Sequence, residues 1–190
     1  MAYSPIIGLR LPFWEPETPA EHHSNIVVLD VWARQITNGQ SIARASASQS
    51  GQNIASSTTT AIVWQTIDYN VPSSNSAYWV SINSSRFTCK TPDTAGVYRA
   101  TFTVTYTTAN ATGSRIMYLQ ATGANNVYNG LARGRIETQA DTEPGRGYSM
   151  TTTWDFPMNQ SDYIQGFVIH NGGASLPVDA QMQITRIGQL

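Results

Sequence analysis

The stretch SRFTCKTPDTAGVYRATFTVTYTTANATGSRIMYLQATG, residues 85–123, decides the fold of this chain. From Gly96 to Thr107 apolar and polar side chains alternate, which is typical of a β-strand with one buried face. The side chains predicted to point inward are Tyr98, Ala100, Phe102, Val104 and Tyr106. A Thr-Pro-Asp turn ends a short strand before it, and an Asn-Ala-Thr-Gly turn leads into another strand after it. We therefore expect three consecutive antiparallel strands here.

The last of these strands, residues 115–120, is apolar on both faces. Ile116 and Tyr118 point to one side, and Met117 and Leu119 point to the other. A strand of a lone two-sheet sandwich buries only one face, so the second apolar face predicts a partner surface beyond the subunit's own core.

Short strands separated by turn residues fill the chain from residue 41 to residue 190. The predicted strands are residues 42–48, 59–67, 78–82, 86–90, 96–107, 115–120, 131–138, 148–156, 163–170 and 178–187. Ten short strands at this spacing favour an all-β fold in which two sheets form a sandwich, rather than an α/β fold.

The order of features in the opening stretch resembles the complement-component-1q and tumour-necrosis-factor-like jelly-roll superfamily. A strand carrying Phe87 is followed by Pro92, by Gly96-Val97-Tyr98 at the start of a long aromatic-rich strand, and by a turn into residues 115–119. The resemblance covers about residues 41–190 and implies a head domain that forms a homotrimer. Residues 182–187 look like the family's last strand, which lies near the threefold axis. An unrelated β-sandwich with similar spacing is the alternative.

The inward-facing and doubly apolar strand positions are predicted to form the jelly-roll core and the trimer contact. They are Phe87, Tyr98, Phe102, Val104, Tyr106, Ile116, Tyr118, Leu119, Trp154, Phe167, Ile169, Met182 and Ile184. Cys89 is the single cysteine, so an internal disulfide is excluded, and its place in a strand predicts a buried thiol rather than a reactive one.

Residues 1–17 form an apolar segment interrupted by prolines, which rule out a helix or a central strand. Large apolar groups are uncommon in disordered segments, so we expect an extended peptide that docks on another protein. The predicted docking residues are Ile6, Ile7, Leu9, Leu11, Phe13 and Trp14.

Residues 18–38 are predicted to form one short α-helix. Thr18 and Glu21 make a capping box at its start, and Asn38-Gly39 is a usual stop. An apolar helix of this length is marginal alone in water, so it either associates with copies of itself, as in a trimeric helix bundle, or packs on the β domain. The predicted self-association residues are Ile26, Leu29, Ala33 and Ile36.

The N-terminal 40 residues also resemble bacteriophage fibre or tail attachment segments. They contain a Gly-Leu-x-Leu-Pro phrase, an acidic patch rich in Pro and Thr, and the short helix. The resemblance implies a virion structural protein that is made in the host cytoplasm, attaches to a capsid or tail protein through this segment, and displays its head on the virion surface. Contact of the head with a host-surface glycan or protein is left open. A bacterial surface or spore-coat adhesin of the same fold and a carbohydrate-active enzyme are the alternatives.

Composition argues against two classes of partner. The net charge of −1 and the 12% of charged residues do not fit a nucleic-acid footprint or a polybasic membrane arm. The sequence shows no basic region followed by an apolar signal core, and no apolar run of transmembrane length. We therefore expect neither nucleic-acid binding nor membrane insertion.

The titratable residues do not predict an enzyme, a cofactor or a metal site. His22 and His23 are adjacent and cannot share a helix face, and His170 is expected at the rim of the domain. Asp141 and Glu143 are the pair that a glycosidase would use, but we favour a salt-bridged loop as their role.

Aromatic side chains near predicted turns are candidates for contact with sugars or with partner proteins. Trp64 is expected beside a turn, and Tyr78, Trp79 and Tyr128 form a predicted ligand rim. We favour use of these rings in the core or in an interface between subunits over contact with a ligand.

Overall fold

The computed structural model describes residues 43–71, 80, 83–90, 95–108, 113–123, 130–139 and 148–188. These residues form ten β-strands, and no helix occurs among them. The strands are β1 (Arg44–Ile54), β2 (Thr60–Ala61), β3 (Thr66–Val71), β4 (Phe87–Thr88), β5 (Gly96–Tyr106), β6 (Ser114–Thr122), β7 (Ala132–Gln139), β8 (Tyr148–Met158), β9 (Tyr163–His170) and β10 (Leu176–Gly188).

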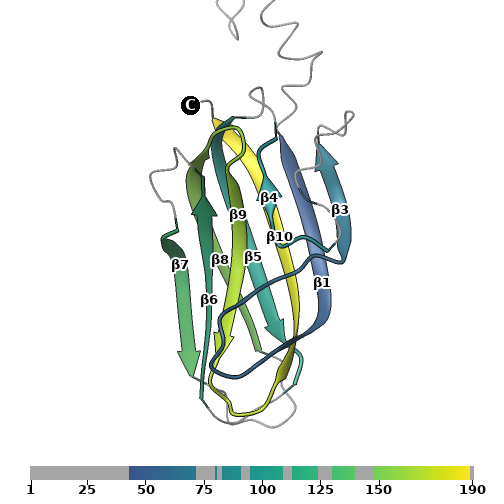
Figure 1. Cartoon of the computed structure of the whole chain (residues 1–190), viewed down its shortest axis with the longest axis vertical. Coiled ribbons are helices and arrows are strands. Elements are labelled where there is room, and N and C mark those ends of the chain that lie inside the picture. The colour runs from purple at the N-terminus through teal and green to yellow at the C-terminus, as the bar shows by residue number, and fades with distance from the viewer. Residues whose placement is uncertain are drawn as a thin grey trace, which may run out of the picture. The chain divides into compact units, whose positions relative to one another are not determined.

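The strands form two antiparallel sheets that face each other as the layers of a sandwich (Figure 1). The first sheet has the order β3-β1-β10-β5-β8. The second has the order β2-β9-β6-β7, and β4 also pairs with β9. The predicted all-β, two-sheet sandwich is confirmed. The predicted extended segment and helix lie outside the described residues.

Strand β5 follows the alternation predicted for it. Its inward side chains, from Tyr98 to Tyr106, are fully buried, and the residues between them are exposed or half-buried. It lies between β10 and β8, with Phe102 opposite Met182 on one side and Thr152 on the other. Because both neighbours keep the same register of inward and outward residues, the whole sheet has one buried face.

The predicted strand at residues 59–67 is wrong as a single element. The chain there crosses from one sheet to the other, so β2 pairs with β9 and β3 pairs with β1. Between the two strands the backbone N–H of Trp64 donates to Ser84 O, 3.0 Å away. Of the predicted strand at residues 78–82 only Val80 is described, and it is buried.

Strand β1 is longer than predicted, because a β-bulge carries it past residue 48. The register with β10 shifts between Gln49 and Gln52, and Gly51 has a positive φ of 68°. A glycine adopts this conformation without the steric cost that a side chain would add, so the strand continues to Ile54.

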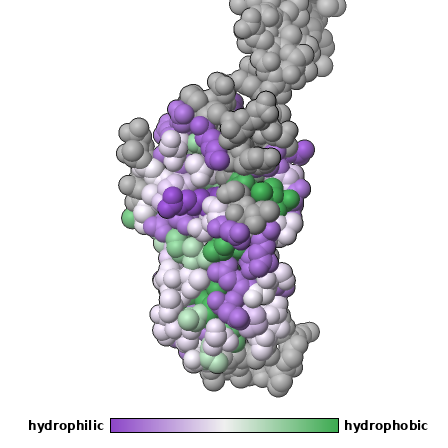
Figure 2. All heavy atoms as spheres, turned by 45° about the vertical axis from the view of Figure 1, so that its right-hand side comes forward, coloured by the Kyte–Doolittle hydropathy of each residue, from purple (hydrophilic) through white to green (hydrophobic). Residues whose placement is uncertain are grey.

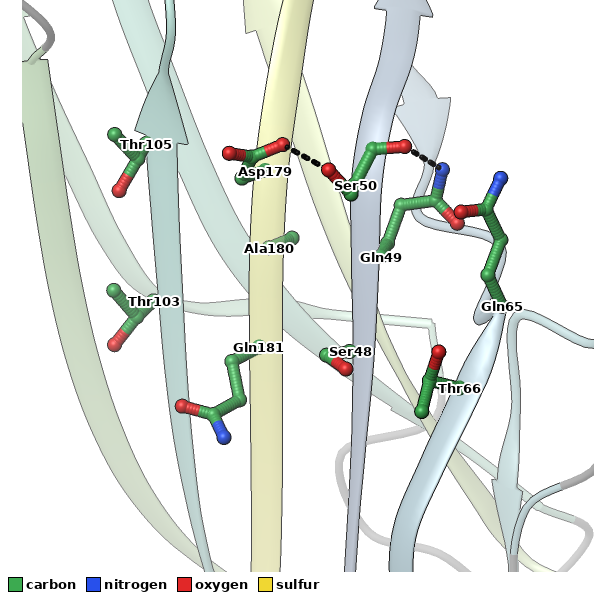
Figure 3. Close-up of a pocket in the computed structure, with 10 residues that line it drawn as sticks. All are labelled: Ser48, Gln49, Ser50, Gln65, Thr66, Thr103, Thr105, Asp179, Ala180 and Gln181. Atoms are coloured by element: carbon green, nitrogen blue, oxygen red, sulfur yellow. Dashed lines mark hydrogen bonds between the residues drawn. The ribbon is translucent and has the colours of Figure 1, made fainter.

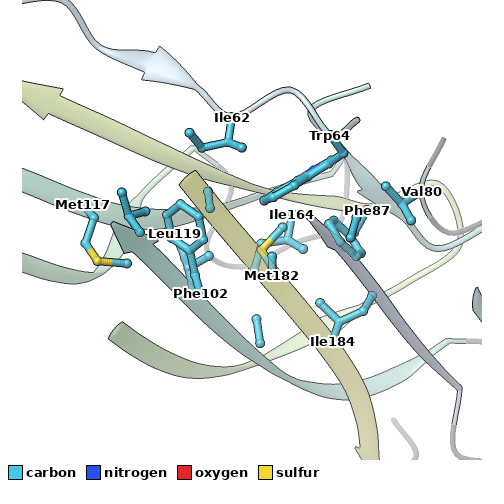
Figure 4. Close-up of a cluster of buried hydrophobic side chains, with 14 of the residues drawn as sticks. Ile62, Trp64, Val80, Phe87, Phe102, Met117, Leu119, Ile164, Met182 and Ile184 are labelled. Atoms are coloured by element: carbon cyan, nitrogen blue, oxygen red, sulfur yellow. The ribbon is translucent and has the colours of Figure 1, made fainter. Parts of the chain in front are cut away.

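The core lies between the two sheets and is centred on aromatic rings (Figure 4). Trp64 meets Phe87 edge to face at a centroid distance of 5.5 Å and Phe102 at 6.4 Å. Trp64 is fully buried, because the chain passes into the core as it crosses between the sheets. Its predicted use in the core is thus confirmed, and the hypothesis of an exposed ring that contacts a ligand is wrong for Trp64. Gly166 is needed beneath Phe102, since a Cβ there would lie 2.6 Å from the ring.

The surface has few large apolar groups. Figure 2 shows the side on which β1 and β3 lie as mostly pale or hydrophilic, with small separate apolar areas. Among the described residues the exposed large hydrophobic side chains are Val63, Leu131 and Ile187. The surface is thus dominated by neutral polar groups.

Candidate functional site

The structure buries most of the predicted core and trimer residues. The fully buried ones are Phe87, Tyr98, Phe102, Val104, Tyr106, Leu119, Met182 and Ile184. The half-buried ones are Ile116, Tyr118, Trp154, Phe167 and Ile169. Trp154 packs against the core and stacks on Phe156 at 4.9 Å, whereas the other four lie together on the outer face of β6 and β9. Their role in a trimer stays a prediction.

Several predicted sites lie outside the described residues. These are the docking residues of the N-terminal segment, the self-association residues of the helix, the ligand rim of Tyr78, Trp79 and Tyr128, and the carboxylates Asp141 and Glu143.

The outer face of the first sheet carries a ladder of hydroxyl groups between β5 and β8. Thr101 pairs with Thr153 at 3.3 Å and Thr103 with Thr151 at 3.0 Å, measured between the hydroxyl oxygens. The Thr105 hydroxyl donates to Ser149 Oγ, 3.1 Å away. These cross-strand pairs satisfy one another, so this part of the face is flat, polar and uncharged.

One exposed ion pair lies next to the Thr101–Thr153 end of the ladder. Arg99 donates from Nε and Nη2 to the two oxygens of Asp155, at 2.8 and 2.7 Å. These bonds hold the pKa of the Asp155 carboxyl below its ordinary value. Both side chains are about half exposed, so the pair orients the strand ends more than it stabilises the fold.

A shallow hollow of about 400 Å³ opens on the same face (Figure 3). Its lining residues come from β1, β3, β5 and β10 and from Gln65. Asp179 Oδ1 accepts hydrogen bonds from Ser50 Oγ at 3.0 Å and from the Gly51 N–H at 2.8 Å. Gln49 Nε2 donates to Ser50 O at 3.1 Å. Asp179, Ser50 and Gly51 thus bond one another, whereas the buried Gln49 Oε1 has no hydrogen-bond partner among the described residues.

Asp68 ties β3 to the centre of this face. Its carboxylate accepts hydrogen bonds from the Ser46 hydroxyl at 2.8 Å and the Ser48 hydroxyl at 3.1 Å, and from Gln181 Nε2 at 3.4 Å. The Asp68 carboxylate thus accepts from three donors on two other strands. Its structural role is enough to account for an acidic residue at this position.

The outer face of the second sheet differs, because it carries aromatic rings. Tyr118 and Phe167 are opposite each other on β6 and β9 and stack at a centroid distance of 5.2 Å. Burial raises the pKa of Tyr118, and a side-chain hydrogen bond with Thr59 opposes that shift. Arg135 and Glu137 on β7 form an exposed ion pair at 2.8 Å.

A buried polar group at one end of the sandwich was not predicted. Arg115 is 3% exposed, and its guanidinium carbon lies 5.3 Å from the centroid of the Tyr106 ring. It points inward because it shares the side of β6 that Met117 and Leu119 occupy. The alternation that placed those two residues inside could have found it.

The expectation that His170 lies at the rim is wrong. It is 1% exposed and is the strand partner of Arg115. Its Nε2 lies 2.7 Å from Ile54 O, and its Nδ1 accepts the Gly172 N–H at 3.2 Å. The proton therefore lies on Nε2, and His170 fastens the end of β1 to β9.

Chemistry-bearing clusters are scarce in the part of the chain that the structure describes. No group of His, Cys, Asp and Glu in it could hold a metal ion. Cys89 is buried, as predicted, and its backbone carbonyl accepts the Ser161 N–H at 2.6 Å. None of the described residues forms a helix long and apolar enough to cross a membrane.

Comparison with known proteins identifies the fold. No protein-family model and no curated protein sequence matches the chain. The structure of murine APRIL is similar with a TM-score of 0.51 and 10% identity, over 76% of this chain and 99% of that one. The PRD1 vertex protein P5 is similar with a TM-score of 0.50 and 15% identity, over 77% of this chain and 98% of that one. The globular domain of zebrafish complement 1qA reaches a TM-score of 0.46 at 13% identity, over 78% and 99%. The described residues share the jelly-roll fold of murine APRIL and of the PRD1 vertex protein P5, as the sequence predicts.

Proposed function

We propose that this chain is a structural protein of a bacteriophage virion, a fibre or decoration protein. Its N-terminal segment attaches to a capsid or tail protein, and its jelly-roll head faces outward and contacts the host surface. The observation that carries the proposal is the fold that the head shares with the PRD1 vertex protein P5. The neutral polar surface of the head supports it, since such a surface suits a displayed domain better than a nucleic-acid or membrane partner.

The protein would be made in the host cytoplasm and exposed on the virion surface. We infer that the protein has no enzymatic role, because this fold is typically non-enzymatic.

We further propose that the head assembles as a homotrimer through the outer face of the first sheet. The resemblance that the sequence shows puts the last strand near a threefold axis, and β10 lies at the centre of this sheet. The hydroxyl ladder beside it has small, mutually bonded side chains, which let another copy approach closely. The Asp68 and Asp179 carboxylates on this face keep their hydrogen bonds to hydroxyl, amide and backbone donors of the same subunit. The apolar face of β6 and β9 is the competing contact.

Light scattering on the full chain tests the trimer. We expect a mass of three subunits of 20.8 kDa. Thr103→Arg together with Thr151→Arg should give a monomer, because two cations would then be buried without partners. Tyr118→Glu should leave the trimer intact. If Tyr118→Glu gives a monomer and the double arginine variant stays a trimer, the contact lies on β6 and β9 instead. If the unmodified full chain is a monomer at high concentration, the proposed trimer is contradicted.

Particles that lack this protein test the virion assignment. Purified full chain should bind such particles, and a chain without residues 1–17 should not. If the full chain binds intact bacterial cells but never particles, the adhesin alternative replaces the virion assignment.

A further inference from the structure

We propose that the outer face of β4, β9 and β6 binds an acidic saccharide, one that carries a carboxylate. We call this face the saccharide platform; it consists of Arg86, Tyr118, Gln120, Tyr163, Gln165 and Phe167. The inference deepens the host contact of the proposed function and rests on it for its biological meaning. The binding itself concerns the purified protein alone.

The strand register brings these side chains onto one face. Gln120 is opposite Gln165, and Tyr118 is opposite Phe167. The alternate residues of β6 and β9 are buried, so these four face outward. Arg86 lies next to Gln165, because Phe87 pairs with Ile164. Neighbouring strands are about 4.8 Å apart and successive outward residues about 7 Å apart, so the rows match the size of linked sugar rings.

Two glutamine amides on the platform are held in fixed orientations. Gln120 Nε2 donates to Gly130 O at 2.7 Å, and Gln165 Nε2 donates to Ser85 Oγ at 2.6 Å. Neither Oε1 accepts a hydrogen bond from the residues that the structure describes. Sugar hydroxyls are donors, so two oriented carbonyl oxygens on adjacent strands suit them.

Arg86 supplies the preference for an acidic sugar. Its guanidinium carbon lies 4.2 Å from the centroid of the Tyr163 ring, and the side chain is exposed. Among the described residues no carboxylate pairs with it. Nearby Asp162 is buried and accepts the Asn159 N–H at 2.9 Å, and Glu137 is paired with Arg135. A guanidinium placed over an aromatic ring makes no hydrogen bond to it, so its N–H groups stay available for a carboxylate.

Tyr118 and Phe167 supply the apolar part of the site. Stacked and half-buried, they present rigid ring surface beside the two amides. The C–H face of a sugar packs on such rings while its hydroxyls reach the polar groups. The hollow on the other sheet has no aromatic lining residue, which is why we place the saccharide here.

Calorimetric titration of the full chain tests the platform with two acidic probes, tetragalacturonate and 3′-sialyllactose. Their neutral counterparts are the methyl ester of tetragalacturonate and lactose. We expect at least one acidic probe to bind. Its neutral counterpart should bind with an affinity that is lower by about tenfold or more. Arg86→Gln should weaken binding of the acidic probe about tenfold. Gln120→Glu should weaken binding of the acidic probe at least as much, because the new carboxylate repels the carboxylate of the probe.

Arg44→Gln is the matched control. Arg44 is an exposed arginine that lies 5.4 Å from the Tyr69 ring, but on the opposite sheet, so its loss should leave binding unchanged. Thermal unfolding of each variant checks that the fold is kept. The inference is overturned if neither acidic probe binds, if the neutral counterpart binds equally well, or if both arginine variants lose affinity alike. A chain that decorates particles yet binds neither probe overturns this inference and leaves the proposed function standing.

Discussion

The two outer faces of the sandwich start from the same strand pattern and end with different properties. On the first sheet the outward residues of β5 and β8 are hydroxyls that bond one another across the strands. On the second sheet the outward residues of β6 and β9 include aromatic rings, the aliphatic Ile116 and Ile169, and two glutamines. The carbonyl oxygens of these glutamines accept no hydrogen bond from described residues. The inward half of the alternation is apolar in both and specifies the sandwich. The outward half is free to differ, and it decides what each face can bind.

The largest loss of stability is expected for a substitution in the core, which lies beneath both faces. Phe102→Ala should lower the free energy of unfolding by about 3–5 kcal/mol, because the ring is fully buried against Trp64. Urea denaturation of the variant and the parent measures the loss. A loss no larger than that of a surface substitution would mean that the two sheets do not pack as described.

Alkaline pH should destabilise the core from within. Burial raises the pKa of Tyr106 to about 12, and burial, followed by the nearby Cys89 thiol, raises the pKa of Tyr98 further. Because the unfolded phenol has a pKa of 10.0, the stability from neutral Tyr106 is complete below pH 10 and is lost as pH rises through 12. The loss is about 3 kcal/mol. Denaturation at increasing pH should show it, and Tyr106→Phe should reduce it.

The two faces themselves can be compared by one substitution on each. Phe167→Ala should cost about 2 kcal/mol, since it removes a half-buried ring and its stack on Tyr118. Thr103→Val should change stability by about 0.5 kcal/mol or less, since it removes one exposed hydroxyl pair. Both substitutions are measured by urea denaturation of the full chain at one fixed protein concentration, because the unfolding of an oligomer depends on that concentration. Equal losses would remove the energetic contrast between the faces.

The smallest effect is expected for Asp155→Asn. The pKa of Asp155 is lowered by its hydrogen bonds with Arg99, so the stabilisation is present above the unfolded pKa of 3.8 and is lost as pH falls below it. Thermal unfolding near neutral pH should barely change. The variant should instead lose a small part of the pH dependence that the parent shows in acid.

The strands were predictable wherever alternation was strict. The inward set of β5 from Tyr98 to Tyr106 was found from the sequence, as were the paired faces of β6. The split between β2 and β3 was not found, because residues 59–67 keep a strand-like composition while the chain changes sheets. Local pattern reports that a segment is extended, but not which neighbour it pairs with.

The candidate sites were harder to predict than the fold. His170 was expected at the rim because it stands close to turn residues, yet the fold turns it inward. The saccharide platform depends on the pairing of β4 with β9, which brings Arg86 to Gln165 across 79 positions of sequence. No spacing within a single segment contains that information.

Because the single thiol is buried, each outer face can be labelled separately through an introduced cysteine. Cys89 is 0% exposed, so it should stay unlabelled in the native protein. A cysteine introduced at Thr103 or at Gln120 would then be the only reactive site, one for each face. A fluorophore attached there would show which face is shielded when copies associate and which responds when a sugar is added.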